Sequence, residues 1–266
     1  MNKHYIALWL LLLTAFVAFA VSSAFDLPEI AGHQLKSSEI YDGIFGQSEI
    51  ENFDLDGDTC FTVPDIDKPE SIFPVPCDST AQIIMLVGDS MLEGLGPRLA
   101  AYADKNGHTL YTVMWYSSTS EVWGKSDKLK SYINRLNPSY IFICLGSNEL
   151  FVSDIAKKRD KYVKKILADI DTIPYVWIGP PNWKDDTGIN DLIKSNTPEG
   201  AFFLSNGMSF ERSKDGAHPT RTSAAEWLDS VARWMPQHAL HPILLEVPEK
   251  SAGKAKRIFV HQPSEQ

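Results

Sequence analysis

The feature that most constrains the fold is a regular alternation, after residue 80, of short apolar runs with longer segments of helical periodicity. Apolar runs with the length of strands stand at residues 82–87, 109–115, 140–145, 175–178 and 201–204. Helical patterns stand at 93–105, 125–136 and 153–170, and a last helix is expected from Pro219, a residue that suits a first turn. Strands that are apolar throughout and separated by helices form parallel sheets covered on both faces. The sequence therefore predicts an α/β domain over residues 81–236, with three α/β/α layers around a parallel central sheet.

Polar residues stand at the carboxyl end of each predicted strand, where open parallel sheets bind their ligands. In chain order they are Asp89-Ser90, residues 117–120, Gly146-Ser147-Asn148, and the segments "IGPPNW" and "DGAHPT". Because these strand ends meet at one edge of the sheet, we expect residues from distant parts of the chain to form one site.

Ser90 is the candidate nucleophile of that site. A serine hydroxyl attacks poorly until a base removes its proton, so a histidine must lie nearby. Among the seven histidines, only His218 has an acid three residues upstream in a predicted turn, Asp215. The carboxylate of Asp215 can accept the Nδ1 proton of His218, which leaves Nε2 free to accept the proton of Ser90. The alternative is that Ser90 only caps a helix and that the other two residues form a surface pair.

Attack of a serine on an ester builds an oxyanion, which needs preorganised hydrogen-bond donors. The backbone N–H of Ser90, at the start of a predicted helix, is one candidate donor. The side-chain amide of Asn148, at the end of the third strand, is the second. An ordinary turn residue is the alternative interpretation of Asn148.

Three of these segments together resemble the motif blocks of the SGNH (GDSL-type) hydrolases. The nucleophile block matches Gly88-Asp89-Ser90, the Gly-x-Asn block matches Gly146-Ser147-Asn148, and the Asp-x-x-His block matches Asp215-Gly216-Ala217-His218. The blocks occur in the family's order and cover about residues 82–236. The resemblance implies a flavodoxin-like α/β/α fold, ester hydrolysis through an acyl-serine intermediate, and no metal or other cofactor. The Gly-x-Ser-x-Gly pentapeptide of the α/β-hydrolases is absent from the sequence.

The sequence departs from this family's pattern in the glycine block, which should follow the second strand and give a backbone N–H to the oxyanion hole. The segment "YSSTSEVWG" has no glycine before Gly124. The N–H of Ser118 or Ser120 is expected to replace it, and we take Ser120 as the third oxyanion donor. A position that requires a positive φ would strain a serine. Glu149 stands where aspartate is frequent, and we expect it to have a structural role.

Aromatic residues flank the predicted site. Trp183, in the loop "GPPNWKDD", is a candidate substrate-binding residue that could stack on a sugar ring. Packing in the protein interior is the alternative for Trp183.

The N-terminal segment is apolar and indicates export. Lys3 is followed by no charged residue before Asp26, and small residues near position 20 or 24 offer a cleavage site. Residues 1–25 are therefore expected to be a signal peptide, or a membrane anchor over residues 5–25, since about 20 apolar residues span a bilayer as a helix. Both interpretations place the rest of the chain outside the cytoplasmic membrane, in the periplasm or the extracellular space, with membrane contact only through this segment.

Two further segments flank the predicted domain. Residues 26–80 form an acidic, proline-containing lead-in, in which "NFDLDGDT" resembles half of a calcium loop but has Val63 where a glutamate ligand is needed. Cys60 and Cys77 are candidates for a disulfide, whereas Cys144 is expected to be a buried thiol. Residues 237–266 are expected to form a loosely structured tail.

The charge distribution restricts the partners. The formal net charge is −9, and most of the acidic excess precedes residue 80, so the predicted domain carries no stripe of Lys and Arg that could bind nucleic acid. A small ester or an acylated polysaccharide is the expected substrate.

These features together predict an exported serine esterase that removes an acyl group through an acyl-Ser90 intermediate, with His218 as the base. An O-acetyl group on a carbohydrate or envelope polymer is the expected substrate by analogy with the family. Two alternatives stay open: an O-acyltransferase that uses the same residues, and a non-catalytic glycan-binding or envelope module on the same fold.

Overall fold

The computed structural model of the chain describes residues 76–205 and 207–266. The predictions for the segment 1–25, for most of the lead-in 26–80, for the calcium-like motif and for the Cys60–Cys77 pairing lie outside the described residues. Within the described ranges, none of the helices combines the length and apolar character that a membrane span requires.

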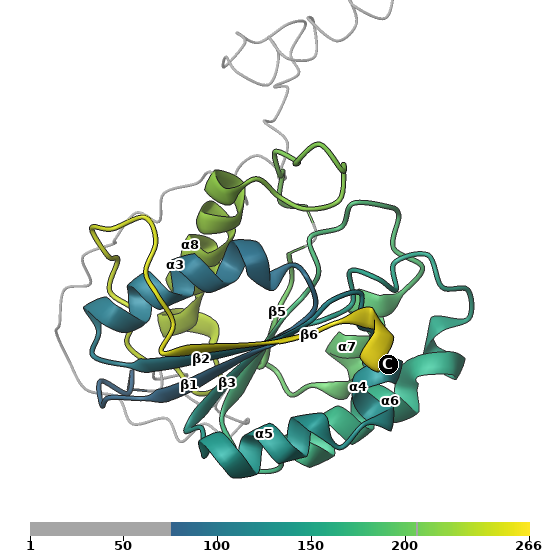
Figure 1. Cartoon of the computed structure of the whole chain (residues 1–266), viewed down its shortest axis with the longest axis horizontal. Helices are drawn as coiled ribbons and strands as arrows, with labels where there is room; N and C mark the ends of the chain where they lie inside the picture. The colour runs from purple at the N-terminus through teal and green to yellow at the C-terminus, as the bar shows by residue number, and fades with distance from the viewer. Residues whose placement is uncertain (1–75, 206) are drawn as a thin grey trace, which may run out of the picture. The chain divides into compact units, whose positions relative to one another are not determined.

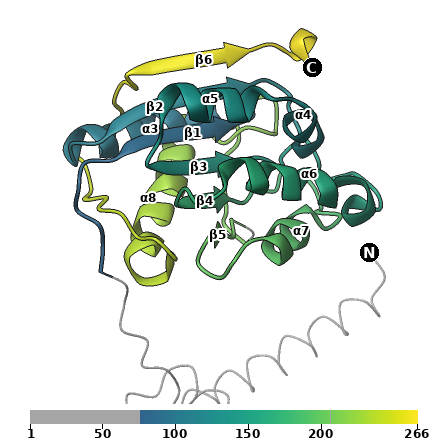
Figure 2. The same ribbon diagram turned by 90° about the horizontal axis from the view of Figure 1, so that it is seen from below.

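The described part of the chain contains one parallel sheet of six strands, in the order β5-β4-β3-β1-β2-β6 (Figure 2). The strands are β1 (Ile83–Gly88), β2 (Thr109–Trp115), β3 (Tyr140–Cys144), β4 (Tyr175–Ile178), β5 (Phe202–Phe203) and β6 (Arg257–His261). The central strands β1 and β3 are buried along almost their whole length, which agrees with their uninterrupted apolar sequence.

Helices cover both faces of this sheet (Figure 1). The helices α3 (Leu92–Lys105) and α8 (Arg221–His238) pack against one face and against each other. The other face is covered by α5 (Lys128–Leu136), α6 (Ile155–Ile170) and α7 (Ile189–Asn196), and the short helix α4 (Ser120–Lys125) packs on α6. The predicted three-layer α/β/α architecture with a parallel sheet is confirmed.

The buried interior has two parts, one on each face of the sheet. Ile84 and Leu86 of β1 point to the α3–α8 side, whereas Met85 and Val87 point to the α6–α7 side. This alternation follows from the two-residue period of side chains along a strand. Cys144 is fully buried, as predicted.

The prediction of a loosely structured tail over residues 237–266 is wrong, because this segment contains a strand of the sheet. Residues 237–266 include the end of α8 and the strand β6, which pairs in parallel with β2 from Tyr111↔Arg257 to Trp115↔His261. A short 3₁₀ turn, Pro263–Glu265, follows it. The sequence pattern concealed β6 because an edge strand has one unpaired side, and this one exposes Ile258 and Val260 to solvent.

Smaller differences concern element boundaries. The helix expected at 125–136 is α5 and begins at Lys128, whereas α4, which precedes it, and α7 were not predicted. The strand expected at 201–204 is reduced to the two residues of β5. The last helix begins at Arg221 rather than at Pro219, because the Thr220 side chain accepts the backbone N–H of Ser223 and so caps the helix at that point.

Candidate active site

The nucleophile loop starts where β1 approaches β3 most closely. A Cβ atom at Gly88 would lie 2.0 Å from the backbone oxygen of Cys144, so only glycine fits this position. The next residue, Asp89, is fully buried, and its Oδ1 accepts the N–H of Met91 at 2.9 Å. This bond closes the turn that presents Ser90 just before α3.

Burial raises the pKa of Asp89 to about 7, because the charged carboxylate loses its hydration inside the protein. The N–H of Met91 and the charge of His218 act in the opposite direction and favour the carboxylate. Asp89 is therefore a buried group of the turn, and no contact places its carboxyl on the hydroxyl of Ser90.

The structure brings together the three residues predicted to act as nucleophile, base and acid. His218 Nε2 lies 2.8 Å from Ser90 Oγ, and His218 Nδ1 lies 2.8 Å from Asp215 Oδ2. Since the ionised carboxylate can only accept, the imidazole proton is on Nδ1, and Nε2 is free to accept from the serine hydroxyl. The predicted hydrogen bonds among these three side chains are thus present.

A tight turn fixes the carboxylate relative to the imidazole. Asp215 Oδ1 accepts the backbone N–H groups of Ala217 and His218, at 2.9 and 3.0 Å, while Oδ2 is bonded to the ring. Gly216 adopts a φ of +72°, which an L side chain rarely adopts, so the turn suits glycine. These backbone donors, His218 N–H first, and then the His218 ring lower the pKa of Asp215 to about 2, so the group stays ionised at neutral pH.

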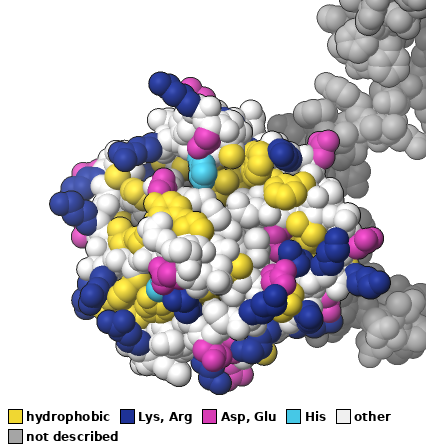
Figure 3. Space-filling view, turned by 45° about the vertical axis from the view of Figure 1, so that its right-hand side comes forward, with side chains coloured by type: hydrophobic (Ala, Val, Ile, Leu, Met, Phe, Trp, Pro, Cys, Tyr) yellow, Lys and Arg dark blue, Asp and Glu magenta, His cyan; other side chains and the backbone are white. Residues whose placement is uncertain are grey.

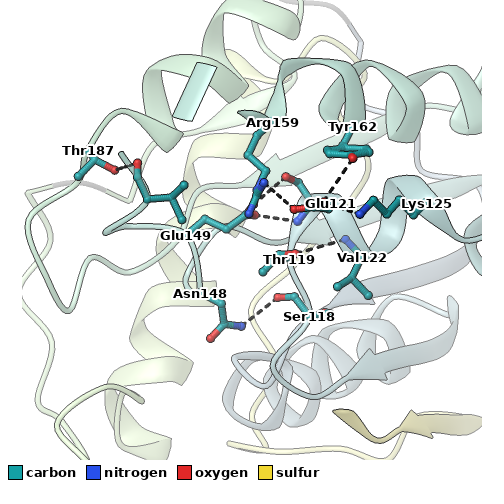
Figure 4. A network of polar contacts seen from close by, with 12 residues as sticks. Ser118, Thr119, Glu121, Val122, Lys125, Asn148, Glu149, Arg159, Tyr162 and Thr187 are labelled. Atoms are coloured by element: carbon teal, nitrogen blue, oxygen red, sulfur yellow. Dashed lines mark hydrogen bonds and ion pairs between the residues drawn. The ribbon is translucent and has the colours of Figure 1, made fainter. Parts of the chain in front are cut away.

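Asn148 joins two loops of the site rather than standing alone. Its Nδ2 donates to the backbone oxygen of Ser118 at 2.9 Å, as Figure 4 shows, and lies 3.5 Å from Asp89 Oδ2. Gly146, two residues earlier, has a φ of +123° and packs closely on Pro180, which lets the chain turn at the end of β3. The amide of Asn148 is therefore held next to the nucleophile turn.

The structure contradicts the prediction that Ser120 supplies an oxyanion donor. The N–H of Ser120 donates to Glu149 Oε2 at 2.7 Å, its Oγ donates to Glu149 Oε1 at 2.9 Å, and the residue is buried. The N–H of Ser118, the other residue considered, donates to the backbone oxygen of Trp115 at 3.2 Å. Both N–H groups are thus already satisfied within the fold.

Ser117, which the sequence analysis did not single out, occupies the position that requires an unusual backbone. It has a φ of +57°, it is exposed, and it lines the same cavity as Ser90. Among the described residues, the backbone N–H groups of Ser117 and Ser90 have no acceptor, so both are available as oxyanion donors. The expectation of a positive φ without a glycine was the signal that could have identified Ser117; such a conformation costs a serine roughly 1 kcal/mol or more.

A buried ion pair fixes the loop that carries Ser117 and Ser118. Glu149 is fully buried and accepts from Arg159 Nε at 2.7 Å as well as from Ser120 (Figure 4). Arg159 Nη1 also contacts Glu121 at 2.6 Å, which ties α4 to α6. Burial raises the pKa of Glu149, and the hydrogen bonds from Ser120 and Arg159 act in the opposite direction. Glu149 has the structural role that was expected.

Trp183 has structural contacts in this arrangement. Its indole N–H donates to the backbone oxygen of Ser147 at 2.9 Å, and its ring lies edge-on to Phe151 at 6.3 Å. The residue is partly buried and packs against both halves of the interior. It is not one of the residues that line the cavity at Ser90, so a contact between Trp183 and substrate stays a prediction.

The cavity beside Ser90 and His218 has a volume of about 910 Å³. Its lining comes from the start of α3, from β2 and the loop after it, from the turn that carries His218, and from the C-terminal segment 253–258. No group of three or more His, Cys, Asp or Glu residues within residues 76–205 and 207–266 is arranged to hold a metal ion.

Comparison with known proteins shows that the structure of this chain is similar to those of solved proteins. No family model matches the sequence, and no curated protein matches it. A psychrotrophic esterase from Pseudoalteromonas sp., solved with monoethylphosphonate as inhibitor, is 16% identical, with 57% of this chain and 97% of that chain covered and a TM-score of 0.41. A G-D-S-L family lipolytic protein from Desulfitobacterium hafniense is 13% identical, with 56% and 98% covered and a TM-score of 0.37. In its parallel α/β/α sheet and in the order and contacts of its three motif blocks, the chain resembles the SGNH (GDSL-type) hydrolases.

Proposed function

We propose that this chain is a serine hydrolase of carboxylic esters. The observation that carries the proposal is the continuous line of hydrogen bonds from Asp215 through His218 to Ser90 Oγ, at the wall of a cavity. A carboxylate, an imidazole and a hydroxyl in this order activate the hydroxyl as a nucleophile.

The first half of the proposed reaction forms an acyl-enzyme. Ser90 Oγ bonds to the carbonyl carbon of the ester as its proton passes to His218 Nε2, and Asp215 stabilises the resulting imidazolium. The carbonyl oxygen becomes an oxyanion that accepts from the N–H groups of Ser90 and Ser117. The side chain of Asn148 is proposed as the third donor, through the N–H that makes only the long contact of 3.5 Å to Asp89 Oδ2 and can turn to the oxyanion instead. When the tetrahedral intermediate collapses, Nε2 gives its proton to the leaving oxygen, and the alcohol departs.

The second half releases the acid. A water molecule attacks the carbonyl carbon of acyl-Ser90, and His218 Nε2 accepts one of its protons. The oxyanion is stabilised by the same donors. The bond to Oγ then breaks, the proton returns from Nε2 to Ser90, and the carboxylic acid leaves, so that water has been consumed and the site is restored.

Two finer points belong to this proposal: the export of the chain, and the acyl group of its substrate, for which the family resemblance suggests O-acetyl on a carbohydrate. Export is supported by the apolar N-terminal sequence before Asp26. The acetyl group rests on the family resemblance alone, whereas the size of the cavity beside Ser90 favours a longer acyl group.

Product analysis tests hydrolysis against transfer. With p-nitrophenyl acetate as donor and an oligosaccharide in excess, we expect the full chain to release free acetate in proportion to p-nitrophenol. That result is expected because the acyl-serine sits at an open cavity that water can enter. The acetate is quantified enzymatically, and the oligosaccharide is examined by mass spectrometry. An oligosaccharide that gains one acetyl group for each p-nitrophenol released would replace the hydrolase assignment with an acyltransferase.

A further inference from the structure

We propose that the cavity beside Ser90 binds the acyl chain of the ester, and that the enzyme prefers acyl chains of medium length, such as octanoyl, to acetyl. This inference rests on the proposed ester hydrolysis at Ser90 and specifies its substrate class. An acetyl group would occupy only a small part of a cavity of about 910 Å³.

The cavity exists because the sheet extends beyond the helix that covers it. Thr112 and Met114 of β2 and Ile258 of β6 form its floor, and Gly96 and Pro97 of α3 form one wall. The strand β6 continues the sheet past α3, and Ile258 of this strand is 57% exposed. The part of β2 and β6 that α3 does not cover extends from the Ser90 side of the cavity toward the C-terminal segment.

The C-terminal segment closes that far end. Gly253 N–H donates to the backbone oxygen of Pro97 at 2.8 Å, and Arg98 Nη1 donates to the backbone oxygen of Lys250 at the same distance. A Cβ atom at Gly253 would lie 2.6 Å from the backbone of Ala100, so this segment lies directly on α3. The space is therefore bounded at one end by Ser90 and at the other by residues 253–255.

The chemistry of the lining matches a hydrocarbon chain. The floor and wall are formed by Met114, Ile258, Pro97 and the backbone of Gly96, with the Thr112 hydroxyl as a buried polar group that has no partner among the described residues. The cationic residues of the lining, Arg221 and Lys254, are exposed. Charged side chains likewise surround hydrophobic patches on the face drawn in Figure 3. A sugar ring would need several free hydrogen-bond partners, whereas two polar residues of the lining, Glu93 and Tyr116, are hydrogen-bonded to each other.

The position of His218 indicates which part of the ester enters the cavity: the leaving alcohol lies next to the histidine, and the acyl chain lies on the other side of Ser90. The leaving oxygen takes its proton from His218 Nε2 and so lies on the side of the cavity that the exposed Arg221 lines. The acyl chain extends away from the histidine, toward β2. Thr112 is paired with Leu86, two residues before the end of β1, and two strand residues span roughly 7 Å, the reach of about half a dozen methylene groups.

The test compares kcat/KM for p-nitrophenyl acetate, butyrate and octanoate with the full chain. Each methylene that enters the cavity is expected to raise kcat/KM by up to about fourfold, and the octanoate ester should exceed the acetate ester by at least about tenfold. The variant Gly96→Leu narrows the cavity, because a Cβ atom there lies 3.9 Å from Leu86 and from Thr112, in ordinary contact. It should lower kcat/KM for octanoate about tenfold and leave acetate within about twofold. The matched control Lys105→Leu puts the same side chain on an exposed part of α3, outside the cavity lining, and should change neither.

Several outcomes would overturn the inference. A wild-type enzyme that prefers acetate, with turnover that depends on Ser90, would remove the acyl-chain assignment and leave the proposed function intact. An equal loss for all three esters in Gly96→Leu would also contradict it. If Gly96→Leu does not fold, competitive inhibition of the wild type decides: octanoate should inhibit at lower concentration than acetate. Absence of turnover for every ester, together with an unreactive Ser90, would instead contradict the proposed function itself.

Discussion

Replacement of Ser90 by alanine is expected to lower kcat for small esters by roughly 10⁴-fold or more, because among the described residues no other hydroxyl is hydrogen-bonded to His218 Nε2. The loss should be confined to chemistry. The one hydrogen bond of Ser90 Oγ within the described residues is to His218, so the alanine variant should keep the far-ultraviolet circular dichroism and the unfolding midpoint of the wild type. Steady-state turnover of p-nitrophenyl butyrate and thermal unfolding provide the two measurements.

Ser131→Ala is the matched control for this experiment. Ser131 is an exposed serine of α5, on the opposite face of the sheet from α3 and α8, and it should keep full activity. Residual turnover of Ser90→Ala within tenfold of the wild type would show that another group attacks the ester.

Asp215→Asn is expected to lower kcat by about 10⁴-fold while leaving the turn in place. The reason is that the two oxygens of the Asp215 carboxylate have different hydrogen-bond partners. Oδ1 accepts two backbone N–H groups, from Ala217 and His218, and an asparagine must keep its oxygen there. Its NH₂ then faces His218 Nδ1 and donates to it, which moves the imidazole proton to Nε2. An Nε2–H facing Ser90 cannot accept the serine proton, so the base is lost although every heavy atom stays in position.

A comparison of Asp215→Asn with Asp215→Ala separates the effect of the His218 tautomer on activity from the effect of the Asp215 turn on stability. The alanine variant loses the two backbone hydrogen bonds and so should unfold at a lower temperature, but it does not force the wrong tautomer on His218. We expect the asparagine variant to be the more stable of the two and no more active. A kcat for Asp215→Asn within tenfold of the wild type would contradict the assigned role of the carboxylate.

The site could be predicted from sequence to the extent that strand ends determine it. Ser90 and Asn148 follow buried apolar strands, and parallel strands bring their carboxyl ends to one edge of a sheet. The pairing of Asp215 with His218 is local, because a carboxylate three residues upstream reaches the imidazole within one turn. These contacts depend on short-range geometry and on sheet topology, and both leave a clear pattern in the residues.

The features that could not be predicted from the sequence depend on contacts between residues that are distant in the chain. Ser120 was predicted as a donor, but its N–H is occupied by Glu149, which lies 29 residues away in sequence. Ser117 was missed because its left-handed backbone is imposed on a serine, without the glycine that normally marks such a position. The strand β6 was missed because β2, its partner among the described strands, precedes it by more than a hundred residues and because the side chains of β6 are largely exposed. In each case tertiary structure, rather than propensity, determined the outcome.

The central claim is that His218 and Asp215 activate Ser90 as a nucleophile, and covalent trapping tests it most directly. The full chain is treated with a fluorophosphonate, digested, and examined by tandem mass spectrometry. The account predicts one phosphonyl group on the peptide that contains Ser90, formed far more slowly in Asp215→Asn and not at all in Ser90→Ala. An unmodified Ser90 in the folded wild-type chain, or equal labelling of wild type and Asp215→Asn, would contradict it.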